Sequence, residues 1–165
     1  MNGCTITVRP GRLEDIAFEA GMNKSLDWCF DERSMLAEFH DHAYEPSSVL
    51  IAELDGRIVG KLELFIARKS VHGRFGMIRR FAVVEDLRGQ GIGKQMLAAA
   101  YEHARAAGCS FVELSVDITN PEAHAFYRRE GWVEDRVEIL MRRSLDGAAH
   151  RSDYAAQADA REFAR

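Results

Sequence analysis

The chain has 165 residues, of which 47% are hydrophobic and 29% charged, and its 22 Lys and Arg against 26 Asp and Glu give a net charge of −4. This size and composition are typical of one globular domain with a short extension, and they exclude collagen, a coiled-coil rod and wholesale disorder. The acidic balance argues against nucleic-acid binding, because sequence-independent binding depends on neutralising phosphates.

Several classes of site and segment are not indicated. No apolar run approaches the roughly 18 residues of a membrane-spanning helix, and the first ten residues lack the pattern of a secretory signal. The three cysteines have no paired spacing, and the six histidines form no metal-binding motif. We therefore expect a cytoplasmic protein that binds neither a metal nor a membrane.

The first half of the chain predicts a strand and two helices before a hairpin. Ile6 and Val8 alternate with polar residues in a short strand that ends at Pro10. A helix is expected over residues 12–21, ending near Gly21, and a second from Asp31 to about Tyr44.

The hairpin joins strands at 49–54 and 57–68 through Asp55-Gly56, a dipeptide typical of a two-residue turn. On the returning strand, alternation predicts one apolar face, made of Ile58, Leu62, Leu64 and Ile66. The other face is expected to carry Lys61, Glu63 and Phe65.

The second half predicts alternating strands and helices. The expected order is a strand at 77–84, a helix at 91–107, a strand at 111–117, a helix at 120–129 and a strand at 137–143. Residues 146–165 are alanine-rich and nearly free of branched apolar residues, so we expect a helical or disordered tail after a domain of residues 1–145. The order of elements predicts a mixed α/β fold with an antiparallel first half and a β-α-β crossover in the second.

A glycine-rich turn between the strand at 77–84 and the next helix carries the chemistry. It contains Arg88, Gly89, Gln90, Gly91, Ile92 and Gly93, and Lys94 follows. Small residues let the backbone approach an anion, and the amide groups at a helix N-terminus point at it. The turn therefore indicates phosphate or pyrophosphate binding. It matches neither the dinucleotide pattern, since Lys94 replaces the third glycine, nor a Walker A loop.

The turn matches R-x-x-G-x-G, and a second block matches N-x-x-A-x-x-F-Y-x-x-x-G-[FW], with Asn120, Ala123, Phe126, Tyr127, Gly131 and Trp132 in its places. Together the two blocks resemble the GCN5-related N-acetyltransferase (GNAT) superfamily. The resemblance implies an acyl-CoA N-acyltransferase fold: a central, mostly antiparallel sheet with a splayed parallel pair, flanked by helices. It also implies acetyl-CoA as co-substrate and direct transfer to an amine, with no covalent enzyme intermediate.

The resemblance also implies roles for single residues. The strand Phe81-Ala82-Val83 would pair with the pantetheine arm and donate an N–H to the oxyanion. The turn from Arg88 to Lys94 would hold the pyrophosphate, Asn120 would contact the pantetheine or a water, and Tyr127 would protonate the leaving thiolate. Arg79 and Arg80 are interpreted as facing solvent rather than the CoA phosphates.

The general base and the acceptor are less constrained. Glu63 is the first candidate for the base, with Asp117 and Glu113 next. The leading expectation for the acceptor is a primary amine of a small molecule. The alternatives are a protein N-terminus or lysine, or no transfer at all by a degenerate acyl-CoA-binding module. A homodimer is also expected.

Overall fold

A five-stranded sheet forms the centre of the computed structural model, which describes residues 6–25, 33, 35–36, 49–69, 73–139, 141 and 143. The strands follow the order β1(Ile6–Pro10), β2(Val49–Leu54), β3(Arg57–Lys69), β4(Gly73–Val83) and β5(Val112–Leu114). Neighbouring strands are antiparallel, except for the parallel pair of β4 and β5. This mixed sheet with one parallel pair confirms the predicted fold class.

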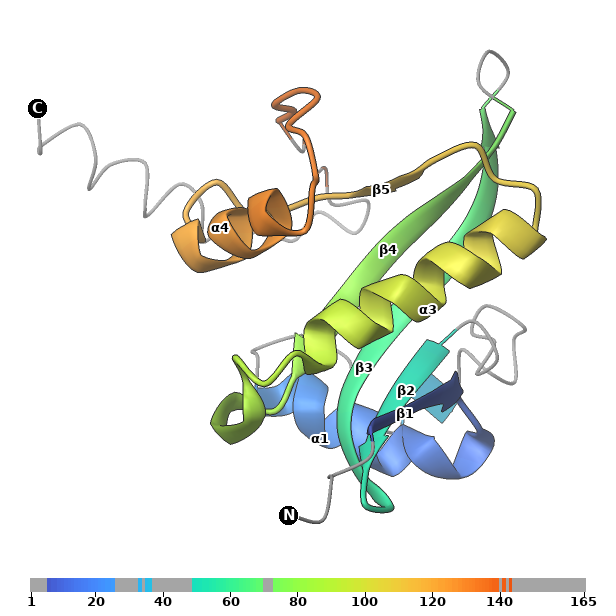
Figure 1. The fold of residues 1–165 in the computed structure, drawn as a ribbon, viewed down its shortest axis with the longest axis vertical. Coiled ribbons are helices and arrows are strands. Elements are labelled where there is room, and N and C mark those ends of the chain that lie inside the picture. The colour runs from blue at the N-terminus through green and yellow to red at the C-terminus, as the bar shows by residue number, and fades with distance from the viewer. Residues whose placement is uncertain are drawn as a thin grey trace, which may run out of the picture. The chain divides into compact units, whose positions relative to one another are not determined.

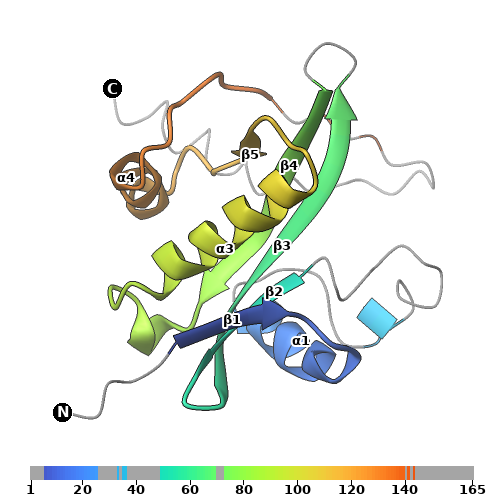
Figure 2. The same cartoon turned by 45° about the vertical axis from the view of Figure 1, so that its right-hand side comes forward.

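Helices cover both faces of the sheet. α3(Ile92–Ala106) lies across β3 and β4 (Figure 1), and its Met96 and Ala104 approach the glycines Gly60 and Gly76 of those strands. On the other face, Ile16 and Ala20 of α1(Ile16–Ser25) pack against β2 in a buried cluster. α4(Pro121–Arg129) follows β5, as Figure 2 shows from a second direction. The predicted helices at 91–107 and 120–129 are confirmed within one residue at each end.

The first helix differs from the prediction. A short 3-10 turn, η1(Leu13–Asp15), precedes α1, and α1 continues past Gly21 to Ser25. Gly21 is exposed and a Cβ there would meet no atom within 4 Å, so this glycine neither breaks the helix nor serves a close approach. Burial of the α1 face against the sheet outweighs the weak helix propensity of one glycine.

The hairpin is confirmed, but one face of its returning strand is not as predicted. Asp55 and Gly56 have φ of +50° and +78°, which match a type I′ turn. A register shift next to Ala52 then leaves one extra residue on β3, and Ile58 packs on the α1 side of the sheet. Because a bulge reverses the alternation, Ile58 does not share a face with Leu62 and Leu64.

The end of the chain departs most from the sequence-based expectation. β5 stops at Leu114 instead of reaching 117, and the described residues 131–139, 141 and 143 form no helix or strand. The predicted strand at 137–143 is therefore wrong within these residues, because alternation alone makes no strand where no neighbour pairs with the backbone.

Residues 131–165 form a unit separate from Met1–Glu130, and the fold described above is that of the first unit. The predicted helix at 31–44 lies outside the described residues, except for Arg33, Met35 and Leu36, which are helical. The tail at 146–165 lies wholly outside them, so the predicted boundary at residue 145 stays a prediction. Within the described part of the chain, no helix has both the length and the apolar character needed to cross a membrane.

Candidate active site

The glycine turn joins β4 to the N-terminus of α3. Gly89 and Gly91 have φ of +77° and +82°, a left-handed conformation that costs other residues roughly 1–2 kcal/mol. Gly91 is also the residue that caps α3, and the first backbone bond of the helix runs from the Gln95 N–H to the Gly91 carbonyl, over 3.2 Å. The sequence Gly-x-Gly is therefore required by the backbone of this turn.

The N-terminus of α3 has the properties of an anion site. The N–H groups of Ile92, Gly93 and Lys94 have no intrahelical acceptor, because they belong to the first turn of the helix. No side chain caps this end, and its first turn holds no acidic residue. Lys94 adds a positive charge at the end of the helix where the dipole is already positive. Gly91 and Lys94 are exposed. Such an arrangement favours a bound anion over any interaction within the chain.

Arg88 ties this turn to the end of β4. Its Nε donates to the Val83 carbonyl over 3.2 Å, and its side chain is exposed. Gln90 is exposed in the same turn. The structure therefore brings together Val83, Arg88 and the two glycines at one end of α3.

Three aromatic rings lie beside the first turn of α3. Phe81 of β4 lies 6.1 Å from Phe126 and 6.5 Å from Tyr127 of α4, and the rings of Phe126 and Tyr127 are 5.2 Å apart. A Cβ on Gly93 would approach Phe126 and Phe81 to 3.2 and 3.3 Å. Gly93 is therefore required for close packing, and the cluster connects Tyr127 to β4.

Burial, with a smaller contribution from Tyr101, raises the pKa of Tyr127 to about 12. The phenol therefore keeps its proton throughout the neutral and mildly alkaline range. A group that is always protonated at neutral pH can donate a proton but cannot serve as a base.

β4 has an open edge next to this cluster. Its pairing with β5 ends at Ile78 opposite Leu114, whereas β4 itself continues to Val83. Beyond β5 the chain leads away to α4 (Figures 1 and 2). Among the described residues, no strand pairs with residues 79–83 on that side. Phe81, Ala82 and Val83 thus lie where an extended ligand can hydrogen-bond to a strand edge.

A β-bulge interrupts β4 at the same place. Lys61 pairs with Ala82 and Glu63 with Arg79, so Leu62 lies opposite two residues, Arg80 and Phe81. Arg80 has φ of +44°, a left-handed value that is uncommon for a non-glycine residue. The sequence did not indicate this bulge, since no glycine marks it.

Glu63, the first candidate for the base, lies beside the bulge. Its side chain is only 1% exposed, and its Oε1 accepts a hydrogen bond from the Arg80 guanidinium over 2.9 Å. Oε2 is buried and has no hydrogen-bond partner within the described part of the chain. A buried polar atom without a partner costs stability, so its presence marks Glu63 as a candidate functional residue.

A second buried ion pair lies next to Glu63. The Lys61 ammonium is 3.5 Å from Glu19 Oε2 of α1, and both side chains are fully buried. Burial lowers the pKa of Lys61, and the carboxylates of Glu19 and Glu63 oppose that effect. The face predicted to carry Lys61 and Glu63 is thus buried at both residues, and Lys61 contacts α1 there.

The other site residues have more ordinary surroundings. Asn120 caps α4, and its Oδ1 accepts from the Ala123 N–H over 3.0 Å. Asp117 Oδ1 accepts from the backbone and hydroxyl of Thr119, which makes Asp117 part of a turn. Glu113 lies opposite Met77 in the parallel pair and is half-buried. None of these contacts tests a role in binding or catalysis.

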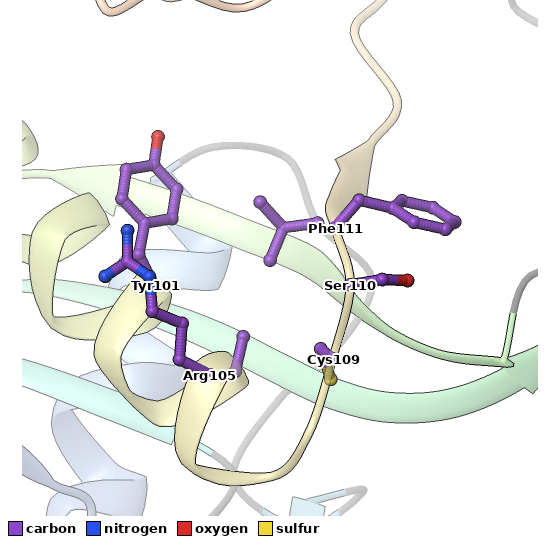
Figure 3. A pocket seen from close by; sticks show the side chains of 7 residues that line it. Tyr101, Arg105, Cys109, Ser110 and Phe111 are labelled. Carbon is purple, nitrogen blue, oxygen red and sulfur yellow. The ribbon is translucent and has the colours of Figure 1, made fainter.

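A cavity of about 140 Å³ opens at the other end of α3 (Figure 3). It is lined by Tyr101, Ala104, Arg105, Cys109, Ser110, Phe111 and Val112. None of the predicted cofactor residues lines it, and the glycine turn lies at the opposite end of the helix. Among the described residues, no three His, Cys, Asp or Glu side chains gather as metal ligands.

Comparison with known proteins decides the family. Residues 12–132 match the model of the acetyltransferase (GNAT) family. The chain belongs to this family. Membership confirms the predicted superfamily.

Two curated relatives and one solved structure illustrate the likeness. The aminoalkylphosphonate N-acetyltransferase of Salmonella typhimurium is 41% identical over 90 residues, which cover 54% of this chain and 58% of that protein. The aminoglycoside N(6′)-acetyltransferase type 1 of Klebsiella aerogenes is 31% identical over 84% of this chain and 96% of its own length. The aminoglycoside N-acetyltransferase AAC(6′)-Iy, solved in complex with CoA, superposes with a TM-score of 0.75 at 20% identity, covering 86% of this chain and 97% of that one. The chain thus spans a little over half the length of the first of these GNAT relatives.

Proposed function

We propose that this GNAT chain transfers the acetyl group of acetyl-CoA directly to a primary amine of a small molecule. The observation that carries the proposal is the open edge of β4 at residues 79–83, which leads into the N-terminus of α3, where no side chain caps the helix. An extended arm that ends in a pyrophosphate matches both features at once.

The cofactor residues divide into two groups. Phe81, Ala82 and Val83 offer backbone hydrogen bonds to the pantetheine arm along the strand edge. Arg88, Gly89, Gln90, Gly91, Ile92, Gly93 and Lys94 hold the pyrophosphate. Asn120, which caps α4, is the remaining contact that we propose for the pantetheine, directly or through a water. The CoA complex of AAC(6′)-Iy, a protein of the same fold, supports acetyl-CoA as the co-substrate.

The acid and the base approach the bulge from opposite faces of the sheet. Glu63 bonds to Arg80, whereas the next residue, Phe81, contacts the ring of Tyr127. The amine attacks the acetyl carbon while the thiolate leaves it, so the base and the acid act on different atoms of the same reacting centre. We assign Glu63 as the base that takes a proton from the ammonium and Tyr127 as the acid that protonates the thiolate. A backbone N–H of residues 81–83 stabilises the oxyanion.

The relatives support a small acceptor. Two of them are named for aminoalkylphosphonates and aminoglycosides, both of which are small molecules with amino groups. Acetylation of a protein N-terminus or lysine is the second candidate for the same chemistry. Homodimer formation, a cytoplasmic location and the absence of nucleic-acid, membrane and metal partners stay predictions.

A direct experiment is to mix the protein with acetyl-CoA and a panel of amines, and to read the release of free thiol. The panel contains polyamines, aminoglycosides, amino acids, aminophosphonates and lysine-containing peptides. Amine-dependent thiol release with a small molecule supports the proposal, and release with peptides alone favours the second candidate. Saturable binding of CoA without transfer to any amine would show an acyl-CoA-binding module instead.

Replacing Tyr127 with phenylalanine tests the acid. We expect kcat to fall roughly 10- to 1000-fold, because the thiolate then leaves without a proton donor, while acetyl-CoA affinity changes little. Since the pKa of Tyr127 is about 12, the wild-type kcat should not decline between pH 8 and 10 through loss of this proton. Tyr101→Phe is the matched control and should keep kcat within about threefold. Equal kcat in Tyr127→Phe and the wild type would remove Tyr127 from the role.

A further inference from the structure

Arg80 stands at an unusual position on β4. It is one of the two residues opposite Leu62 in the bulge, and its φ of +44° is one that arginine rarely adopts. A left-handed conformation is unfavourable for a residue with a side chain, so its presence here calls for a compensating contact. The ion pair with Glu63 at 2.9 Å, in which neither side chain is more than 17% exposed, is such a contact.

The ion pair gives the two carboxylate oxygens of Glu63 different surroundings. The guanidinium occupies Oε1, while Oε2 remains buried without a partner in the described part of the chain. A carboxylate held in this way has one oxygen fixed and the other available for a proton. The same contact compensates the cost of burying a negative charge.

Other charged groups near Glu63 do not replace Arg80. Lys61 on β3 interacts electrostatically with Glu63, but its ion pair is with Glu19 of α1. Arg79, the other arginine of β4 at this level, has its guanidinium 5.7 Å from the centre of the Phe65 ring and is exposed. Among the described residues, Arg80 is therefore the cation with an ion pair to Glu63.

We propose that Arg80 is the positioning residue for Glu63: it holds Oε1, so that Oε2 can accept a proton from the acceptor ammonium. This inference rests on the proposed function and goes beyond it. Oε2 gains the proton, the neutral amine forms a bond to the acetyl carbon, and the bond from that carbon to sulfur breaks. The thiolate takes its proton from Tyr127, and the nitrogen of the new amide loses its second proton, which returns to the Tyr127 phenolate through water. Glu63 then releases the first proton to solvent.

Arg80→Gly is the most informative variant. Glycine adopts the left-handed backbone without strain, so the bulge is kept while the guanidinium is lost. A buried carboxylate without its cation holds a proton more tightly, and a base must be deprotonated to act. The acidic limb of the profile of kcat/KM against pH should therefore move up by at least about one pH unit, with activity recovering at alkaline pH. Arg80→Lys keeps the charge and should move the limb less.

The control is Arg79→Ala, which removes a neighbouring arginine and the same charge but no contact to Glu63. Its pH profile should coincide with that of the wild type, and acetyl-CoA affinity should stay within about twofold in every variant. Carboxyl ¹³C NMR of glutamate-labelled protein, with Glu63→Gln to assign the signal, gives a readout that does not need turnover. We expect the titration midpoint of this signal to move upward in Arg80→Gly.

The outcomes separate this inference from the proposed function. If Glu63→Gln removes the acidic limb but Arg80→Gly leaves both the limb and the NMR midpoint in place, the positioning role is wrong and the base assignment stands. If the NMR midpoint moves in Arg80→Gly while Glu63→Gln retains full activity, Arg80 controls the carboxylate but Glu63 is not the base. That second result would overturn the catalytic part of the inference.

Discussion

Gly91→Glu is expected to weaken acetyl-CoA binding on the order of 100-fold, equivalent to about 2.7 kcal/mol. A Cβ on Gly91 would meet no protein atom within 4 Å, so the loss arises from the new charge and the backbone rather than from a clash. The carboxylate would stand among the helix N–H groups that we assign to the pyrophosphate and would repel it. Isothermal titration with acetyl-CoA and CoA measures the change.

Gly108 offers a matched control at the other end of α3. Its φ is +74°, close to the +82° of Gly91, and a Cβ there would also meet nothing within 4 Å. Gly108→Glu should therefore lose comparable stability but keep acetyl-CoA affinity within about twofold. Equal loss of affinity in both variants would show that backbone strain, not the anion site, explains the effect.

Glu63→Gln is expected to lower kcat/KM by roughly 100- to 10,000-fold, the range for loss of a general base. The amide has nearly the same shape as the carboxylate but cannot accept the proton of an ammonium. Acetyl-CoA affinity should change little, since Glu63 lies on the face of the sheet opposite the Tyr127 cluster. The rate of thiol release, compared with that of the wild type, checks this value.

Glu53→Gln is the control for this loss. Glu53 also accepts from an arginine, Arg9, but it lies on β2 near the hairpin turn. Removing its charge should affect stability slightly and activity by less than about threefold. Retention of full activity by Glu63→Gln would exclude Glu63 as the base and return Glu113 and Asp117 to consideration.

Local sequence patterns were sufficient to predict the structure where a few neighbouring residues determine the backbone conformation. Asp55-Gly56 predicts its turn because both residues tolerate positive φ, and Gly89 and Gly91 predict theirs for the same reason. The apolar stripe of α3 predicts both the helix and its buried face. Either Thr119 or Asn120 could cap α4 by sequence, and in the structure Asn120 does so.

Sequence patterns gave wrong predictions where the pairing of strands determines the structure. Alternation predicts that Ile58 shares a face with Leu62. The bulge in β3, at the register shift next to Ala52, instead places Ile58 on the α1 side of the sheet. The segment at 137–143 alternates as a strand does, yet its described residues are irregular. Periodicity describes one strand, whereas a strand exists only with a partner whose backbone it can bond.

The amino-acid sequence on its own was thus enough for the family, the order of most elements and the glycine turn, since each depends on residues close together in the chain. Only the tertiary structure showed the open edge of β4, the bulge and the pairing of Arg80 with Glu63, which are 17 positions apart. Arg80 resembled a solvent-facing residue in the sequence because its charge indicated exposure. The fold buries Glu63 and places Arg80 of the neighbouring strand beside it, where its charge offsets the cost of burying a carboxylate.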